Sequence, residues 1–199
     1  LSRAHTCALP IFQLDERERR EQKARFKPVQ PGQVRRPARL VIAHGRLPGR
    51  RARSGPALPR VERSGFGPFL FYEWAYDEEG ELIPDFILNN PDYGAAEVLV
   101  SGPNFGSGSS REHAPWSIED RGFKAIIAPS FADIFFNNCI AIGLLPVVLS
   151  DEEVAHLTEV AADPDNLVTV DLEAQTVTTV GFEASFEIDP FAKHRLANG

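Results

Sequence analysis

Residues 97–149 of this 199-residue chain read EVLVSGPNFGSGSSREHAPWSIEDRGFKAIIAPSFADIFFNNCIAIGLLPVVL, and this stretch decides the fold. Three apolar runs within it, at residues 97–101, 123–128 and 144–149, have the length of buried strands. The segment from Ser130 to Ile142 has apolar side chains near helical spacing, and Gly143 follows where a helix C-terminal cap is expected. Strands that alternate with helices in this way predict an α/β domain.

The sequence downstream adds one more helix and then strands that adjoin one another. Ser150 or Asp151 can cap a helix over residues 151–162, which ends before Pro164. The segments VTVDLEA, TVTTVGF and ASFEID, at residues 168–174, 176–182 and 184–189, alternate apolar and polar residues in the manner of β-hairpins. For residues 60–199 we therefore predict one domain with a mixed β-sheet and helices packed on it.

The first 59 residues differ from the rest in charge and composition. Residues 1–60 hold 15 of the 21 Lys and Arg but only 4 of the 28 Asp and Glu, a net charge of +11, which leaves −18 for residues 61–199. From Pro28 to Pro59 the chain is rich in Pro, Gly and Arg and lacks periodic apolar residues, so it cannot bury enough surface to offset its ordering entropy. We predict an arm over residues 1–59 that is disordered or not native to the protein. A basic nucleic-acid-binding arm is the alternative, but residues 28–59 have no aromatic residues interleaved with the basic ones, so no nucleic-acid partner is expected.

Apolar runs and cysteines limit the location and the metal chemistry. No apolar run approaches the roughly 20 residues of a membrane span, and the start LSRAHTCALPIF lacks a secretory signal, so we expect no membrane association and a cytoplasmic location. Cys7 and Cys139 are the only cysteines, with no CxxC pair. Because an iron-sulfur cluster is normally held by more thiolates than two, we expect this chain to bind no metal, and any cluster must come from another chain.

The segment from Gly102 to Pro115, GPNFGSGSSREHAP, carries the chemistry. A glycine-rich turn between a strand and a helix frees backbone N–H groups to bind an anion, and the helix N-terminus adds a favourable field. The structural alternative is a loop in which Ser109 caps the helix and Glu112 completes a capping box. That alternative places Pro115 in the second helical turn, where it removes a hydrogen bond, so the helix boundary stays open.

Three familiar catalytic or phosphate-binding patterns do not fit this loop. No GK[ST] follows the glycines as in a Walker loop, and GSGSSR lacks the third Gly of GxGxxG. A Ser-His-Asp hydrolase could be built from Ser109, His113 and Asp133, but the GxSxG turn is absent because Gly106, Ser107 and Gly108 are consecutive.

The motifs NFGSGSSREHAPW and GFKAIIAPSFADIFFNNCIAIGLLPVVL resemble the small subunits of the 3-isopropylmalate dehydratase family, the swivel domain of the aconitase superfamily. VERSGFGPFLFYEWAY and PDFILNNPDY upstream extend the resemblance, which runs from about Arg60 to Gly199, about 70% of the chain. Three features depart from that family. A VDTDxIIP-type motif and its strand are missing ahead of Arg60, the family continues past the position of Gly199, and Ser107 stands where many relatives have Cys. We therefore expect a C-terminally truncated domain.

The resemblance implies an α/β aconitase-like swivelling domain and a hydro-lyase activity in leucine biosynthesis. In that family, 2-isopropylmalate is converted to 3-isopropylmalate by loss and return of water, and a four-iron four-sulfur cluster on a large subunit acts on the substrate. The implied partners are therefore that large subunit and a small diacid substrate. Two alternatives stay open: a related hydro-lyase subunit acting on homoaconitate or a methyl-branched malate, and a non-catalytic interaction module with the same fold.

The family motif also implies roles for the loop residues. Ser109 matches the base that takes a proton next to a carboxylate, and Arg111 matches the clamp on a substrate carboxylate. Ser110 is an adjacent hydrogen-bonding group, and the backbone N–H groups near Gly106 and Gly108 are expected to bind the substrate. The planar fork of an arginine suits a carboxylate because it can donate two parallel hydrogen bonds.

Overall fold

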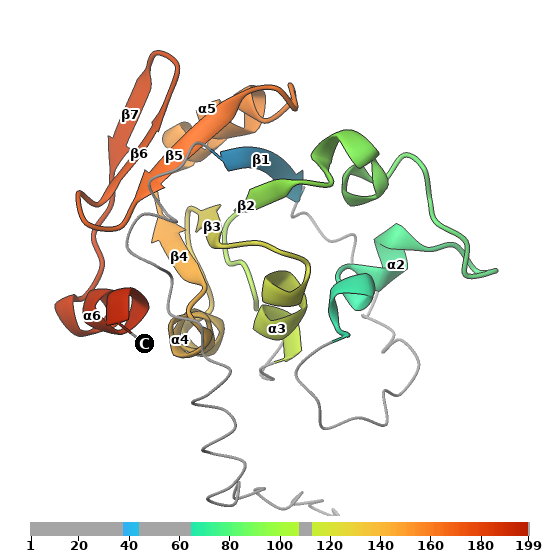
Figure 1. Cartoon of the computed structure of the whole chain (residues 1–199), viewed down its shortest axis with the longest axis horizontal. Helices are drawn as coiled ribbons and strands as arrows, with labels where there is room; N and C mark the ends of the chain where they lie inside the picture. Colours follow the sequence, from blue (N-terminus) through green and yellow to red (C-terminus); the bar gives the residue numbers. More distant parts are fainter. Residues whose placement is uncertain (1–37, 44–64, 108–112, 199) are drawn as a thin grey trace, which may run out of the picture.

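The computed structural model describes residues 38–43, 65–107 and 113–198. Its seven-stranded sheet has the order β4-β3-β2-β1-β5-β6-β7 (Figure 1). The strands are β1 Ala38–Ala43, β2 Ala96–Ser101, β3 Ala125–Ala128, β4 Leu145–Val148, β5 Leu167–Asp171, β6 Thr176–Thr179 and β7 Phe182–Ser185. The strands β1 to β4 are parallel, whereas β5 pairs antiparallel with β1 and with β6, and β6 with β7. The predicted mixed sheet, the three buried strands and the C-terminal hairpins are confirmed.

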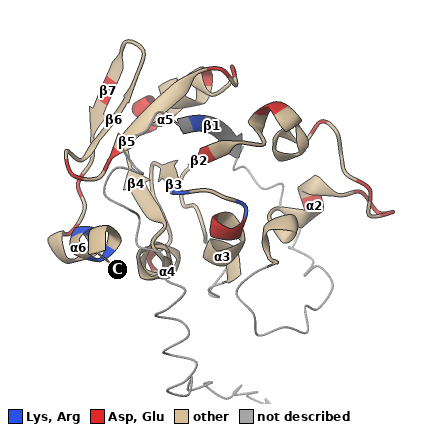
Figure 2. Cartoon of the chain, in the orientation of Figure 1, with Lys and Arg blue, Asp and Glu red and all other residues tan. Residues whose placement is uncertain are grey.

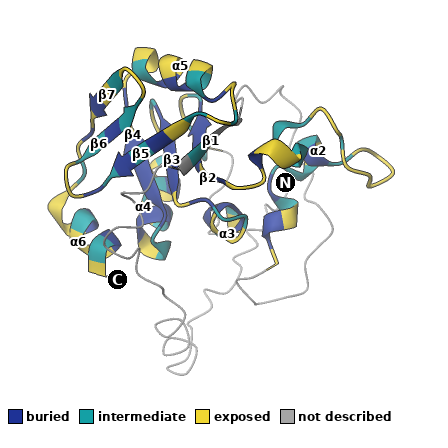
Figure 3. Cartoon of the chain, turned by 45° about the horizontal axis from the view of Figure 1, so that its top comes forward, coloured by how far each residue is buried: buried dark blue, intermediate teal, exposed yellow. Residues whose placement is uncertain are grey.

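Helices cover both faces of the parallel part of the sheet. They are α2 Tyr72–Ala75, α3 His113–Asp120, α4 Asp133–Ile142, α5 Asp151–Val160 and α6 Pro190–Asn198, with 3-10 turns at Gly67–Phe69, Ile87–Asn89 and Pro91–Tyr93. One core cluster joins Leu99 and Ile126 to side chains of α3 and α4. The other joins Val100 and Val147 to α5, the hairpin strands and α6. Residues of β2, β3 and β4 therefore contribute to a core on each face, and Figure 3 colours these strands mostly as buried, which explains why they are almost continuously apolar in sequence.

The ends of two helices follow the local sequence signals. Gly143 adopts a left-handed conformation with φ of 88° at the C-terminal cap of α4, as expected of a glycine there. Ser150 caps α5 in a full capping box with Glu153. The start of α4 differs from the prediction: it lies at Asp133 rather than Ser130, because Ser130 and Ala132 use their backbone groups to pair with Phe105.

A strand occurs where the sequence predicted none. Ala38–Ala43 lies within the predicted arm of residues 1–59, yet it forms β1 at the centre of the sheet, parallel to β2 and antiparallel to β5. The guanidinium of Arg39 also donates to the carbonyl oxygen of Asp92 at 3.0 Å. The expectation of an arm without tertiary contacts therefore does not hold at these six residues. The rest of residues 1–59 lies outside the described part of the chain.

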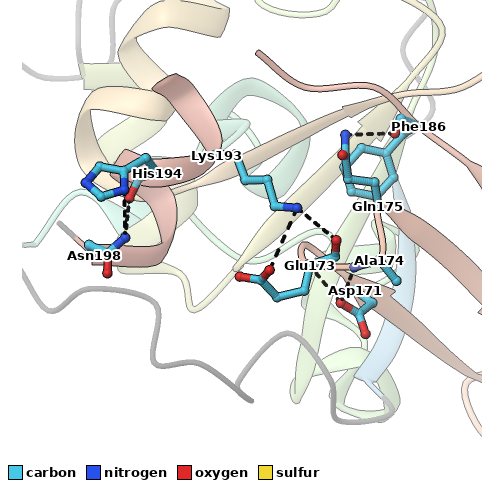
Figure 4. Close-up of polar contacts among 8 residues, drawn as sticks. All are labelled: Asp171, Glu173, Ala174, Gln175, Phe186, Lys193, His194 and Asn198. Carbon is cyan, nitrogen blue, oxygen red and sulfur yellow. Dashed lines mark hydrogen bonds and ion pairs between the residues drawn. The ribbon is translucent and has the colours of Figure 1, made fainter. Parts of the chain in front are cut away.

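The last helix, α6, is tied to the hairpin by polar contacts. Lys193 Nζ donates to the carbonyl oxygen of Glu173 at 2.8 Å and lies 3.8 Å from its carboxylate (Figure 4). At the start of the helix, the Asp189 carboxylate accepts from the N–H groups of Phe191 and Ala192. Asp189 followed by Pro190 is a helix-start signal. This helix was not predicted from the sequence.

Candidate functional site

The candidate loop follows β2, at the edge of the sheet where the parallel strands end. Gly108, Ser109, Ser110 and Arg111 lie outside the described residues, as does Glu112. Ser107 and His113 flank this segment and are described. The loops after β2 and β3 meet at the same edge because parallel strands place their carboxyl ends together, and such edges are the usual place for ligands in α/β sheets.

The first part of the loop is fixed against the loop that follows β3. Phe105 forms a parallel bridge with Phe131, in which its N–H donates to Ser130 and its carbonyl accepts from Ala132. The N–H of Asn104 donates to Ser130 Oγ at 2.8 Å. Asn104 has φ of 61°, a conformation that asparagine tolerates better than most side chains. These hydrogen bonds fix the two residues that precede Gly106 and Ser107 against residues 130–132, which lead directly into α4.

Gly106 is required by its surroundings. It has φ of +82°, and a Cβ atom there would lie 2.2 Å from Phe135 Cγ. Phe135 is almost fully buried, and Phe105 packs edge-on against it with ring centroids 5.3 Å apart. The predicted use of Gly106 in substrate binding is not tested by these contacts. They give it a packing role that the sequence could not show.

The other end of the loop leads into α3. His113 is exposed, but its ring contacts Phe66 at a centroid distance of 5.3 Å and Trp116 at 5.2 Å. Pro115 is the third residue of the described part of α3. Asp133, the third member of the rejected triad, is exposed at the first position of α4, where a carboxylate favours the helix.

Residues 65–95, which we call the excursion, lie beside α3 and hold all the aromatic residues of the SGFGPFLFYEWAY segment. Phe71 stacks on Trp74 with centroids 5.5 Å apart, and Phe86 meets both rings edge-on. Phe71 has a left-handed backbone with φ of 54°, which costs a bulky residue free energy. These rings are half-buried, which is compatible with either a core or an interface role.

The charges around the site are almost all negative. Residues 65–107 contain no Lys or Arg, and Figure 2 shows only acidic residues coloured on this part of the chain. In sequence, Arg111 is the only Lys or Arg between Arg63 and Arg121. Residues 65–107 therefore offer an approaching diacid no Lys or Arg.

The described residues do not fit a metal cluster. Within residues 38–43, 65–107 and 113–198, no three His, Cys, Asp or Glu side chains are grouped as metal ligands. Cys139 is a residue of α4 and is fully buried in the core, and burial raises the pKa of its thiol well above the ordinary value, which disfavours the thiolate that binds metals. Cys7 lies outside the described residues.

In the described part of the chain, no helix has the length and apolar character needed to cross a bilayer.

The comparisons with known proteins agree with the resemblance noted in the sequence. Residues 55–152 match the Aconitase C-terminal domain family, and residues 157–190 match the LeuD_N model. The 3-isopropylmalate dehydratase small subunit of Halalkalibacterium halodurans is 58% identical over 143 residues, which cover 71% of this chain and 74% of the relative. The chain belongs to the 3-isopropylmalate dehydratase small-subunit family.

Other members of the family show similar agreement. The small subunit of Rubrobacter xylanophilus is 56% identical, with 72% of this chain and 71% of the relative covered. A solved 3-isopropylmalate dehydratase (leuD) structure from Methanocaldococcus jannaschii is 24% identical, with 79% of this chain and 84% of that chain covered and a TM-score of 0.47. That likeness is too low for a comparison of sites. The names of the curated relatives support the isopropylmalate branch over the homoaconitate, methyl-malate and non-catalytic alternatives.

Proposed function

We propose that this chain works as the small subunit of a 3-isopropylmalate dehydratase, which isomerises 2-isopropylmalate to 3-isopropylmalate in leucine biosynthesis. The observation that supports it best is an intact GSGSSRE loop at the carboxyl end of β2, in a chain 58% identical to a small subunit of that name. A partner large subunit and a cytoplasmic location belong to the same proposal.

The partner carries the four-iron four-sulfur cluster in this proposal, because the described residues of this chain offer no ligand set for it. Such a cluster supplies a Lewis acid that polarises the substrate's hydroxyl and carboxylate oxygens. The small subunit then contributes the remaining parts of the site: the base, the clamp on a second carboxylate and a wall that excludes water.

Ser109 is proposed to take the proton from the carbon next to a carboxylate. A serine hydroxyl is a weak source of base because its alkoxide is costly in water, so the site must stabilise that oxyanion with N–H groups and positive charge. The backbone near Gly106 and Gly108 can supply the N–H groups, and Arg111 can supply the charge. Arg111 also suits a substrate carboxylate because its guanidinium donates two parallel hydrogen bonds. Ser110 adds a third hydrogen-bonding group.

Reconstitution tests this proposal. The purified chain is mixed without oxygen with a 3-isopropylmalate dehydratase large subunit that carries its cluster, and the conversion of 2-isopropylmalate is followed. We expect no turnover by either subunit alone and turnover by the mixture. Homoaconitate and methyl-branched malates serve as parallel substrates. Turnover by the isolated chain, or a preference for one of the parallel substrates, would contradict the proposal.

A further inference from the structure

The excursion, residues 65–95, consists of one-turn helices, 3-10 turns, loops and an isolated bridge between Tyr76 and Leu82, and the backbone hydrogen bonds described for it lie within the excursion itself. Side chains fix it instead. Asn89 Nδ2 donates to the carbonyl oxygens of Ala75 at 2.7 Å and of Ile83 at 2.9 Å, and these two bonds connect the middle of the excursion. Tyr93 Oη donates to the carbonyls at the end of α5. Arg39 of β1 adds the hydrogen bond to the Asp92 carbonyl, and further ties come from the end of α3.

Two neighbouring residues at the end of α3 hold two separate parts of the excursion. The Asp120 carboxylate accepts hydrogen bonds from Gly65 N at 3.0 Å and from Gly67 N at 2.7 Å. The Arg121 guanidinium donates to the carbonyl oxygen of Leu88 at 3.0 Å. The end of α3 therefore forms hydrogen bonds with both the first residues of the excursion and the 3-10 turn at Ile87–Asn89.

Both glycines match the Asp120 contact. Gly65 has φ of +91°, which only glycine adopts without strain. A Cβ atom on Gly67 would lie 3.2 Å from both Asp120 Oδ2 and Arg121 N. Asp120 itself stands at the C-terminal end of α3, where the helix dipole disfavours a carboxylate. Stabilisation of the helix therefore does not explain an aspartate at this position, whereas the two N–H groups do.

The grip on Gly65 and Gly67 also orients Phe66, the residue between them. Phe66 is buried, and its ring contacts His113 at a centroid distance of 5.3 Å and Trp116 at 5.9 Å. His113 begins α3 as described and stands two residues after Arg111 in sequence. The Asp120 carboxylate at the end of α3 thus fixes the backbone on both sides of Phe66, whose ring packs on His113 at the beginning of the described part of the same helix.

We propose that Asp120 is a positioning residue: by holding Gly65 and Gly67 it keeps Phe66 against His113 and so fixes the first described turn of α3, which follows Ser109 and Arg111 in sequence. Asp120 touches no substrate in this proposal and acts only through the excursion. The kinetic consequence rests on the proposed function, whereas the mechanical consequence, loss of order at the start of α3, does not.

Hydrogen exchange tests the mechanical part on the purified chain. Asp120→Ala should speed deuterium uptake in peptides covering residues 65–70 and also in those covering residues 113–118, while the α5 peptide stays protected. Gly67→Ala should act in the same direction from the other side of the contact. Asp85→Asn is the matched control, because this exposed carboxylate lies in the excursion and accepts no hydrogen bond from the described residues. Unchanged exchange at residues 113–118 in Asp120→Ala would overturn the proposal, whether or not the chain is an active subunit.

Kinetics on the reconstituted complex tests the functional part. In Asp120→Ala we expect kcat per assembled complex to fall about 10- to 100-fold, because small misplacements of catalytic groups have large effects on rate. Asp120→Asn should stay within about threefold of wild type because its amide oxygen still accepts hydrogen bonds. A residue that only stabilises the fold would lower the melting temperature and leave kcat per assembled complex unchanged, and that result would refute positioning. An inactive wild-type mixture would instead count against the proposed function and leave the exchange experiment to decide.

Discussion

Replacing Gly106 by alanine should be among the most damaging small changes in the described part of this chain. Two costs add. A left-handed backbone at an alanine costs about 1–2 kcal/mol. The new Cβ would lie 2.2 to 2.6 Å from three atoms of Phe135, and overpacking of this kind costs about 1–3 kcal/mol. Phe135 is 1% exposed and cannot swing into solvent. We therefore expect Gly106→Ala to lower the free energy of unfolding by about 2–5 kcal/mol.

Gly80 provides a matched control for the backbone cost. It has φ of +85°, close to the +82° of Gly106, but nothing lies within 4 Å of the Cβ position. Gly80→Ala should therefore show the backbone cost alone, about 1–2 kcal/mol, in urea unfolding followed by circular dichroism. Phe135→Leu should partly relieve Gly106→Ala in the double variant, with a coupling of about 0.5–3 kcal/mol. Equal losses in Gly106→Ala and Gly80→Ala would show that Phe135 does not restrict this position.

Two further predictions concern the supports of the fold. Ser150→Ala breaks the capping box of α5 and should cost about 1 kcal/mol in urea unfolding, whereas Ser150→Asp should restore most of it; no loss in the alanine variant would refute the cap. Burial, with smaller effects from Asp163 and Asp92, raises the pKa of Tyr93 above 10.0. The protonated hydroxyl therefore stabilises the fold fully below pH 10, and this stability is lost as pH rises through the raised folded pKa. Tyr93→Phe should cost about 1 kcal/mol at neutral pH and flatten the decline of stability above pH 10, and an unchanged alkaline decline would contradict it.

The sequence predicted those parts of the fold whose causes are local. The apolar runs at residues 97–101, 123–128 and 144–149 became β2, β3 and β4, and Gly143 and Ser150 became caps, because strand burial and capping act within a few residues. The strand Ala38–Ala43 was missed because it has only a short apolar run in a basic, Pro-rich context. Its place depends on the pairing with β2 and β5.

The candidate site was predictable in position and only partly in its supports. The loop's place after a strand follows from the sequence pattern, and β2 confirms it. The dependence of Gly106 on Phe135, the bridge between Phe105 and Phe131, and the grip of Asp120 on Gly65 all join residues more than 25 positions apart. A periodic pattern carries no information about such contacts, so the sequence alone could not have found them.

The most direct test of the central claim is kcat of Ser109→Ala in the reconstituted complex, with 2-isopropylmalate as substrate. If Ser109 is the base, kcat should fall by about 10²–10⁴-fold with little change in assembly, because a positioned acid-base group contributes that much. If Ser109 is only a helix cap, the variant should lose about 1 kcal/mol of stability and keep its turnover, and Ser109→Asp should restore the stability. Near-normal kcat in Ser109→Ala would contradict the catalytic assignment of the loop.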